Sequence, residues 1–195
     1  MQSQKENSQE TRRTFLKKSS LLTAGLTAAV SGAIPRVHAA EDNTIKIALI
    51  GCGGRGTGAA FDALATQGPK KLWAMADVFP HRLNGSYRGL VDARPDEVDV
   101  PEERRFLGLD GYKHAIDAIG PGGVALLCTA PAFRPLHVEY AVEKGVHIFM
   151  EKAFGVDAPG VRRIIAAGKK ADEKNLKVAG GLMSRHSFPL QRCIE

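Results

Sequence analysis

The sequence has few cysteines, no long hydrophobic run and little net charge outside its first 39 residues. Its three cysteines, Cys52, Cys128 and Cys193, are an odd number without paired spacing, which argues against a disulfide framework or a zinc site. We predict no metal site and interpret each cysteine as a small buried residue. The apolar stretch over residues 21–34 has about 14 residues, fewer than the roughly 20 that cross a bilayer, so we expect no stable membrane anchor.

The net charge of +6 on 195 residues would by itself suggest an anionic partner such as nucleic acid. Residues 1–39, however, hold six basic and only two acidic residues, which leaves 21 basic and 19 acidic residues for the rest of the chain. A remainder with a net charge of +2 has no broad electrostatic surface for a polyanion. We therefore expect no nucleic-acid partner.

Residues 1–39 have the features of an export signal. A twin arginine, Arg12-Arg13, precedes the apolar stretch, and Val37-His38-Ala39 supplies the small residues that signal peptidase requires. We predict a twin-arginine signal peptide that is removed after Ala39, and hence an exported, periplasmic or otherwise extracytoplasmic protein. A cytosolic amphipathic helix and an uncleaved anchor are the alternatives. Because the twin-arginine route carries folded proteins, it suits an enzyme that loads a nucleotide before export.

The rest of the chain alternates between apolar strands and helices, without internal repeats. Strands are expected at residues 44–50, 72–76, 105–108, 124–128, 147–150 and 176–179. Helices are expected at 56–67, 80–91, 112–119, 134–144 and, capped by Asp157, to about 171, with a charged loop at 92–103. Strands that are apolar on both faces predict an α/β, doubly wound parallel sheet covered on both sides. We place this Rossmann-type domain at residues 40–182.

A glycine-rich turn follows the first expected strand and opens the first helix. The run Gly51-Cys-Gly-Gly-Arg-Gly56 fits the pattern G-x-G-x-x-G in the context that dinucleotide binding requires. Gly51 permits the tight turn, Gly53 lets the backbone approach a pyrophosphate, and Gly56 lets helix and strand pack closely. The helix N-terminus then offers free N–H groups to the phosphates. We predict cofactor contacts from Gly51, Gly53, Gly54, Arg55 and Gly56; a purely structural turn is the alternative.

Asp77 ends the second expected strand, 26 residues after Gly51. A carboxylate there can accept hydrogen bonds from the adenosine ribose hydroxyls and would repel a 2′-phosphate, which favours NAD over NADP as the cofactor. Arg82 lies five residues further on and could hold that phosphate, so NADP is the second choice. The alternative interpretation of Asp77 is a solvated side chain at a strand end.

A third group of residues follows the later strands. Thr129 and Glu151 each end an apolar run, and in a parallel sheet both strand ends open onto one crevice. Lys152 would then lie where nicotinamide and substrate meet, and its ammonium group could polarise a hydroxyl or relay a proton. From spacing alone, a solvated lysine and a packing or capping histidine at position 137 are the simpler interpretations.

These segments together resemble the Gfo/Idh/MocA family, the relatives of glucose–fructose oxidoreductase and inositol dehydrogenase. The resemblance spans residues 44–195 and rests on an ordered set of segments: Cys128-Thr-Ala-Pro131, His137, Ala141 to Gly145, and His147-Ile-Phe-Met-Glu-Lys152. The signal peptide and the glycine loop look like the exported branch found in planctomycete-type bacteria. The resemblance implies cofactor contacts by Thr129, Pro131, His137, Glu151 and Lys152, and a catalytic role for Lys152. Ala153 replaces the proline of the family's Glu-Lys-Pro motif, so this loop lacks the fixed φ that a proline would impose.

Family members continue into a second α/β domain that builds most of the substrate pocket, whereas this chain ends at Glu195 inside an expected helix. We therefore interpret residues 183–195 as the start of a segment leading to an absent domain, and the chain as the inactive N-terminal part of a longer, homo-oligomeric enzyme. The resemblance implies an NAD(P)-dependent oxidoreductase that transfers hydride to or from a sugar, cyclitol or related polyol. An NAD-dependent glycoside hydrolase and a non-catalytic nucleotide-binding module are the alternatives; a methyltransferase would not explain Glu151-Lys152.

Overall fold

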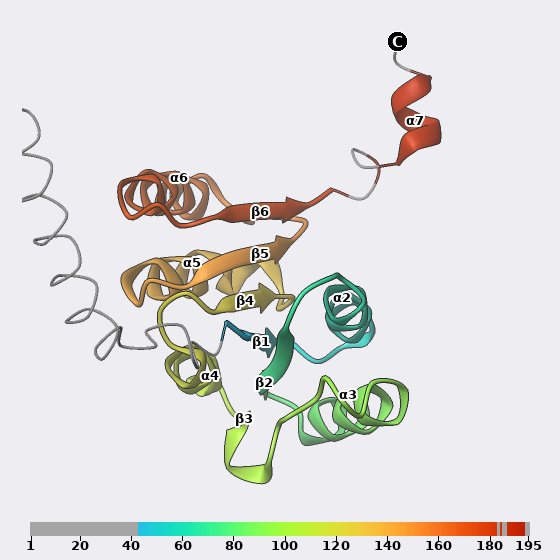
Figure 1. The fold of residues 1–195 in the computed structure, drawn as a ribbon. Coiled ribbons are helices and arrows are strands. Elements are labelled where there is room, and N and C mark those ends of the chain that lie inside the picture. The colour runs from blue at the N-terminus through green and yellow to red at the C-terminus, as the bar shows by residue number, and fades with distance from the viewer. Residues whose placement is uncertain (1–42, 183, 185–186, 194–195) are drawn as a thin grey trace, which may run out of the picture. The chain divides into compact units, whose positions relative to one another are not determined.

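The computed structural model describes residues 43–182, 184 and 187–193. Six strands form its sheet (Figure 1): β1 (Ile45–Ile50), β2 (Lys70–Asp77), β3 (Arg105–Leu107), β4 (Val124–Leu127), β5 (His147–Glu151) and β6 (Val178–Gly181). The helices are α2 (Gly54–Leu64), α3 (Pro80–Ala93), α4 (Gly111–Ile119), α5 (Arg134–Glu143), α6 (Ala158–Glu173) and α7 (Phe188–Arg192). Short 3-10 turns lie at Glu102–Arg104 and Pro131–Phe133.

The signal peptide predicted for residues 1–39, with its twin arginine and its cleavage after Ala39, lies outside the described residues. It stays a prediction that N-terminal sequencing of the mature protein can check. Among the residues that are described, no helix combines the length and the apolar character needed to cross a membrane.

The sheet is entirely parallel and has the order β3-β2-β1-β4-β5-β6. The chain runs outward from β1 to β3, returns past β1 to β4, and continues outward to β6. The helix that follows β1 covers one face of the sheet and the helix that follows β4 covers the other (Figure 1). The C-terminal ends of β1 and β4 therefore border the topological switch point, where open α/β sheets bind their ligands. The prediction of a doubly wound parallel sheet is confirmed.

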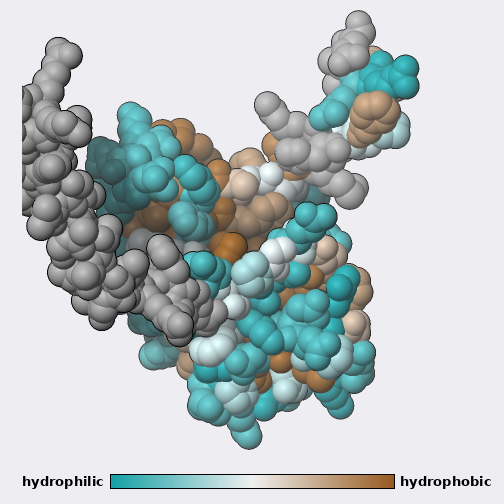
Figure 2. Space-filling view, viewed as in Figure 1, coloured by the Kyte–Doolittle hydropathy of each residue, from teal (hydrophilic) through white to brown (hydrophobic). Residues whose placement is uncertain are grey.

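Each face of the sheet has its own apolar core. Helices α2 and α3 pack on one face through Ala60, Leu64, Leu83 and Leu90, all of which are 2% exposed or less. Helices α4, α5 and α6 pack on the other face through Ala115, Ile116, Val138, Ala141, Ala167 and Ala171. Burial on both faces explains why the strands are nearly continuous apolar runs in the sequence. Figure 2 shows mostly hydrophilic residues over the outer surfaces of α2 and α3, with smaller apolar patches among them.

The expected elements occur within a few residues of their predicted bounds. The largest difference concerns α2, which ends at Leu64 instead of residue 67, while bounds of β2, α3 and β6 differ by two residues. The predicted cap of α6 is confirmed, because Asp157 Oδ1 accepts a hydrogen bond from the Gly160 N–H at 2.6 Å.

All three cysteines have free thiols. Cys52 is buried and Cys128 is partly buried, as expected of small packing residues, but Cys193 is exposed. The prediction for Cys193 is wrong because this residue follows the short helix α7, which has no buried residue.

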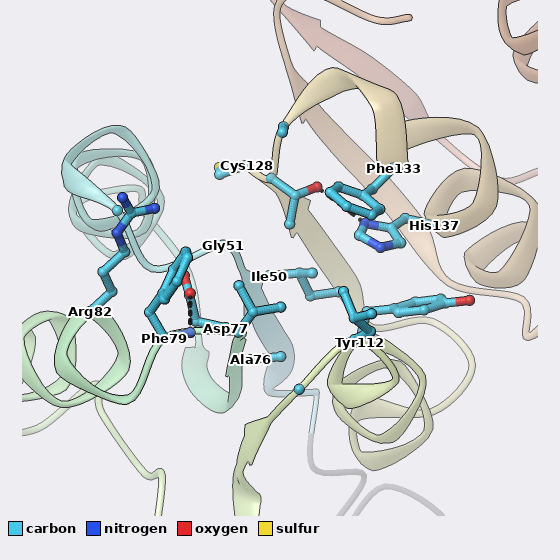
Figure 3. Close-up of a pocket in the computed structure, with 16 residues that line it drawn as sticks. Ile50, Gly51, Ala76, Asp77, Phe79, Arg82, Tyr112, Cys128, Phe133 and His137 are labelled. Atoms are coloured by element: carbon cyan, nitrogen blue, oxygen red, sulfur yellow. Dashed lines mark hydrogen bonds between the residues drawn. The ribbon is translucent and has the colours of Figure 1, made fainter.

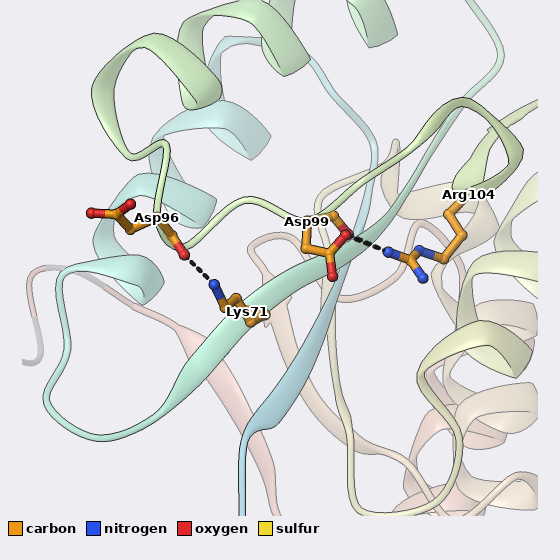
Figure 4. Close-up of polar contacts among 4 residues, drawn as sticks. All are labelled: Lys71, Asp96, Asp99 and Arg104. Carbon is orange, nitrogen blue, oxygen red and sulfur yellow. Dashed lines mark hydrogen bonds and ion pairs between the residues drawn. The ribbon is translucent and has the colours of Figure 1, made fainter. Parts of the chain in front are cut away.

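The charged segment between α3 and β3 is irregular, as expected, yet it is held firmly along β2. The Leu72 N–H donates to the Glu97 carbonyl at 2.8 Å, and the Asp99 N–H donates to the Leu72 carbonyl at 2.9 Å. Two basic side chains add to this (Figure 4): Lys71 donates to the Asp96 carbonyl, and Arg104 Nη2 donates to Asp99 Oδ1 at 2.7 Å. The segment thus occupies the part of the β2 edge that β3 is too short to reach.

Candidate functional site

A crevice opens at the C-terminal ends of β1, β2 and β4, at the switch point of the sheet. Figure 3 shows Phe79 and Arg82 on one of its sides and Tyr112, Phe133 and His137 on the opposite side. The glycine loop and the end of β2 form part of the lining, and the segment after β4 completes it. The sequence-predicted residues that line it are Gly51, Gly53, Asp77, Arg82, Thr129 and His137.

The glycine loop contributes backbone atoms to the lining of this crevice, through Gly51 and Gly53. Gly51 has a φ of +97°, and a Cβ there would lie 2.7 Å from the Thr129 backbone nitrogen. At Gly56 a Cβ would lie 1.8 Å from the Gly51 carbonyl oxygen, whereas at Gly53 it would meet nothing within 4 Å. The turn and packing roles predicted for Gly51 and Gly56 are therefore confirmed, and the backbone at Gly53 is open to an approaching group.

The same loop ends in a helix whose first N–H groups have no side-chain cap. Gly53 is the N-cap residue, with extended backbone and no capping hydrogen bond, and α2 begins at Gly54. The first N–H groups of a helix lack intrahelical acceptors, so an anion at this end of α2 would meet unpaired donors. Neither Gly54, which is exposed, nor the buried Gly56 lines the crevice itself.

Asp77 is buried against the glycine loop. Its Oδ2 accepts from the Cys52 N–H at 2.6 Å. Its Oδ1 accepts from the Phe79 N–H at 2.9 Å, the bond drawn in Figure 3. At 9% exposure it is not the solvated aspartate of the alternative interpretation. Each carboxylate oxygen can accept more than one hydrogen bond, so Asp77 can fix the loop and still accept from a ligand in the crevice. Arg82 stacks on Phe79 beside it, with its guanidinium carbon 4.7 Å from the ring centroid.

Thr129 and His137 form one wall of the crevice. Thr129 Oγ1 lies 3.2 Å from His137 Nδ1, and the imidazole packs on the Tyr112 ring with 4.2 Å between centroids. Burial, helped by the nearby Arg134 guanidinium, lowers the pKa of His137 to about 4. The imidazole is therefore neutral near pH 7. Pro131 begins the 3-10 turn after β4 and lies outside the crevice lining.

The low pKa of His137 makes stability depend on pH. The folded state favours the neutral imidazole, so its contribution is complete above pH 6.5, the ordinary pKa, and is lost as the pH falls towards about 4. The linked loss is at most about 3 kcal/mol. We expect His137→Asn, which can keep a hydrogen bond to Thr129 without titrating, to lose less stability between pH 7 and pH 4.5 in urea unfolding. Equal losses in both proteins would refute the assignment.

Three charged side chains cluster at the ends of β4 and β5. Arg55 Nη2 lies 2.6 Å from Glu151 Oε1, with the arginine side chain 55% exposed and the glutamate side chain 6% exposed. Arg134 is fully buried; it donates to the Thr129 carbonyl at 2.7 Å and to the Glu151 carbonyl. Burial is the main cause that lowers the pKa of Arg134. Sequence reasoning missed Arg134, since an arginine in the first turn of a helix is usually solvated.

A second depression adjoins this cluster. Arg55, Glu151 and Lys152 line it together with Gly181, Leu182 and Ser184. Lys152 is exposed, and the Lys152–Ala153 peptide bond is cis. A Cβ at Gly181 would lie 2.8 Å from Glu151 Oε1, so this glycine leaves the space that the carboxylate occupies. Gly181 is a site residue that was not predicted; its only signal in the sequence is its place after an expected strand, beside a second glycine.

The structure thus distributes the predicted residues over two neighbouring sites. Gly51, Gly53, Asp77, Thr129 and His137 share the crevice, while the second depression brings together Arg55, Glu151 and Lys152. In the described part of the chain, no group of three or more histidine, cysteine, aspartate or glutamate side chains is arranged to hold a metal ion.

No family model matches the sequence, and no curated protein matches it. Among solved structures, scyllo-inositol dehydrogenase from Lactobacillus casei with bound NAD(H) and scyllo-inositol is similar at 24% identity, with a TM-score of 0.58, over 77% of this chain and 39% of its own. Myo-inositol 2-dehydrogenase from Lactobacillus plantarum follows at 21% identity and a TM-score of 0.60, over 77% and 40%. A 3-ketoreductase from Actinomadura kijaniata, in complex with NADP and TDP-benzene, is 20% identical with a TM-score of 0.55, over 78% and 41%.

These similarities establish the fold, a Rossmann-type α/β domain. The chain spans about two fifths of the length of these structures.

Proposed function

We propose that this chain is the nucleotide-binding part of an NAD(P)-dependent oxidoreductase of the Gfo/Idh/MocA family. The observation that carries the proposal is the crevice at the switch point, which is lined both by the open backbone at Gly53 and by the buried carboxylate of Asp77. Structural neighbours were solved with NAD(H) and scyllo-inositol, or with NADP and TDP-benzene. We therefore propose a sugar, cyclitol or related polyol as the substrate of the whole protein.

The residues present fit a dinucleotide. A pyrophosphate can approach Gly53, because no atom would block even a Cβ there, and it would meet the first N–H groups of α2. Asp77 lies at the end of β2, where a carboxylate can accept hydrogen bonds from an adenosine ribose. When bound, the nicotinamide ring supplies the hydride acceptor or donor at its C4.

Lys152 is the proposed proton-transfer residue. It is exposed at the rim of the second depression, directly after the buried Glu151. Its ammonium group could hold or relay the proton of a substrate hydroxyl. Arg134 would hold the ends of β4 and β5 at a fixed separation, because it donates to the carbonyls of Thr129 and Glu151. Lys152, which follows Glu151, would then stay at a constant distance from the crevice wall at Thr129.

NAD is the proposed cofactor, with NADP as the second choice. The negative charge of Asp77 would repel a 2′-phosphate at the adenosine ribose. Arg82 lines the same crevice and is the positive group that could offset this repulsion. The opposing charges of Asp77 and Arg82 would together set the preference for NAD or NADP.

Asp77→Asn tests this proposal by removing the charge while keeping one acceptor for the loop N–H groups. Loss of a charge-assisted hydrogen bond costs about 1.5–3 kcal/mol, so NAD affinity should fall roughly 10- to 150-fold. The ratio of NAD affinity to NADP affinity should also decrease. Isothermal titration calorimetry with both cofactors measures this. Asp62→Asn, at an exposed carboxylate on α2, is the matched control and should bind as the wild type does.

Two results would count against the assignment in different ways. Unchanged NAD affinity in Asp77→Asn would exclude Asp77 as a ribose contact but leave a dinucleotide site in place. Absence of NAD and NADP binding by the wild-type chain at millimolar concentrations would contradict the proposed function as a whole.

A further inference from the structure

Arg55 occupies an unusual position between two sites. It is the second residue of α2, so it lies in the first helical turn beyond Gly53, where a diphosphate would meet the helix. Its guanidinium nevertheless pairs with Glu151 at the end of β5, at 2.6 Å. Hydrogen bonding to Glu151 is the main cause that raises the pKa of Arg55; Asp62 is a weaker negative neighbour. The residue next to the proposed phosphate site is thus already bound to a carboxylate.

The two partners of this ion pair differ in freedom. The Arg55 side chain is 55% exposed, so it can change rotamer without disturbing the core, whereas Glu151 is 6% exposed and fixed. Glu151 also has a second positive neighbour, the fully buried Arg134. Arg134 donates to the backbone carbonyl of Glu151 and interacts electrostatically with the Glu151 carboxylate. Departure of Arg55 would therefore not leave the buried carboxylate without a counter-charge.

The cluster of Arg55, Glu151 and Arg134 holds two positive charges and one negative charge. An anion at the start of α2 would find a favourable field there, and a guanidinium binds phosphate oxygens in a planar, bidentate geometry. We propose that Arg55 exchanges partners: it pairs with Glu151 in the free protein and moves to the cofactor diphosphate on binding. Glu151 then acts as a competitor of the diphosphate for one guanidinium. This inference rests on the proposed function, because it requires a dinucleotide at the glycine loop.

The exchange predicts effects of opposite sign for the two partners. Glu151→Gln releases Arg55 and should tighten diphosphate binding, while Arg55→Gln should weaken it. A purely structural ion pair would not strengthen binding when either partner is removed. Simple removal of a nearby negative charge could also tighten binding, but that effect would persist without Arg55. The double variant separates the two explanations, since competition through Arg55 disappears in the Arg55→Gln background.

ADP-ribose is the appropriate probe, because it carries the diphosphate without nicotinamide and so removes any contact between Glu151 and that ring. Calorimetric titration of the full chain should show Glu151→Gln binding about 2- to 5-fold more tightly than the wild type. Arg55→Gln should bind about 10-fold more weakly, with a reduced salt dependence. The double variant should match Arg55→Gln within about 2-fold.

The controls are Glu139→Gln and Arg163→Gln, which break an ion pair between α5 and α6. The side chains of Glu139 and Arg163 are 38% and 46% exposed, respectively. Neither residue lines the crevice or the second depression. Both controls should leave ADP-ribose affinity unchanged, and thermal melts should establish that every variant is folded.

Unchanged or weaker binding of ADP-ribose by Glu151→Gln would overturn the proposed exchange. Binding of ADP-ribose by the wild type would in that case still support the dinucleotide site. Equal tightening by Glu151→Gln with and without Arg55 would also overturn it. If Arg55→Gln does not fold, Arg55→Lys replaces it in both backgrounds and should bind less tightly than the wild type. Failure of the wild type to bind ADP-ribose at all would overturn both this inference and the proposed function.

Discussion

Gly56→Ala should destabilise the domain by at least about 3 kcal/mol or prevent its folding, although alanine is the better helix former. The added methyl group would lie 1.8 Å from the Gly51 carbonyl oxygen, and backbone atoms cannot move aside as a flexible side chain can. Relief would require α2 to move away from β1, which would open the core beneath Ala60 and Leu64.

Gly58→Ala, two residues further along the same helix, is the matched control. A methyl group there would meet only Arg55 Nη1, at 3.8 Å, so the substitution should stabilise the domain by roughly 0.5–1 kcal/mol through helix propensity. Urea unfolding of the two variants measures the difference. Comparable stability of both proteins would show that helix and strand are not packed as closely as the structure describes.

Arg134→Met should destabilise the domain by about 2–6 kcal/mol. The side chain is fully buried and donates to the carbonyls of Thr129 and Glu151. Methionine fills similar space but removes the donor to the buried Glu151 carbonyl and to the partly buried Thr129 carbonyl, each at a cost of about 1–3 kcal/mol. Arg134→Lys should rescue little, because one ammonium group lacks the planar fork that reaches two carbonyls.

Denaturant unfolding checks this prediction, with Arg163→Met as the control. Arg163 is also a helical arginine, but it is half-exposed, so its substitution should change stability by no more than about 0.5 kcal/mol. A loss of less than 1 kcal/mol in Arg134→Met would mean that water or the relaxed backbone can satisfy both carbonyls. Arg134 would then have a role other than holding β4 and β5 together.

The fold and the glycine loop could be predicted because local patterns determine them. Apolar runs alternate with helices at lengths that only a parallel sheet accommodates, and the spacing of Gly51, Gly53 and Gly56 specifies a turn at a strand end. Both groups of site residues could be assigned to one edge of the sheet, because parallel strands all end there. The expectation that Thr129 and Glu151 open onto one crevice is wrong, because Glu151 lines a separate depression with Arg55 and Lys152. Those inferences needed no knowledge of side-chain conformation.

The polar contacts between segments could not be predicted. Arg55 and Glu151 lie 96 residues apart in the sequence, and each is surrounded by residues that leave other partners equally plausible. The burial of Arg134 depends on two backbone carbonyls, which every residue supplies and no sequence pattern distinguishes. Asp77 was correctly placed at the end of β2, but its hydrogen bonds to the N–H groups of Cys52 and Phe79 depend on the path of two loops.

The segment that lies along β2 also bears on how this domain avoids aggregation. β3 pairs with only the last three residues of β2, Met75–Asp77, which would leave a row of unpaired backbone groups at the edge of the sheet. The backbones of Glu97 and Asp99 instead form hydrogen bonds with the N–H and the carbonyl of Leu72. The charged side chains of these two residues discourage a further strand from pairing at this edge. A neighbouring chain could add a strand at this edge only by displacing a segment that Lys71 and Arg104 hold in place.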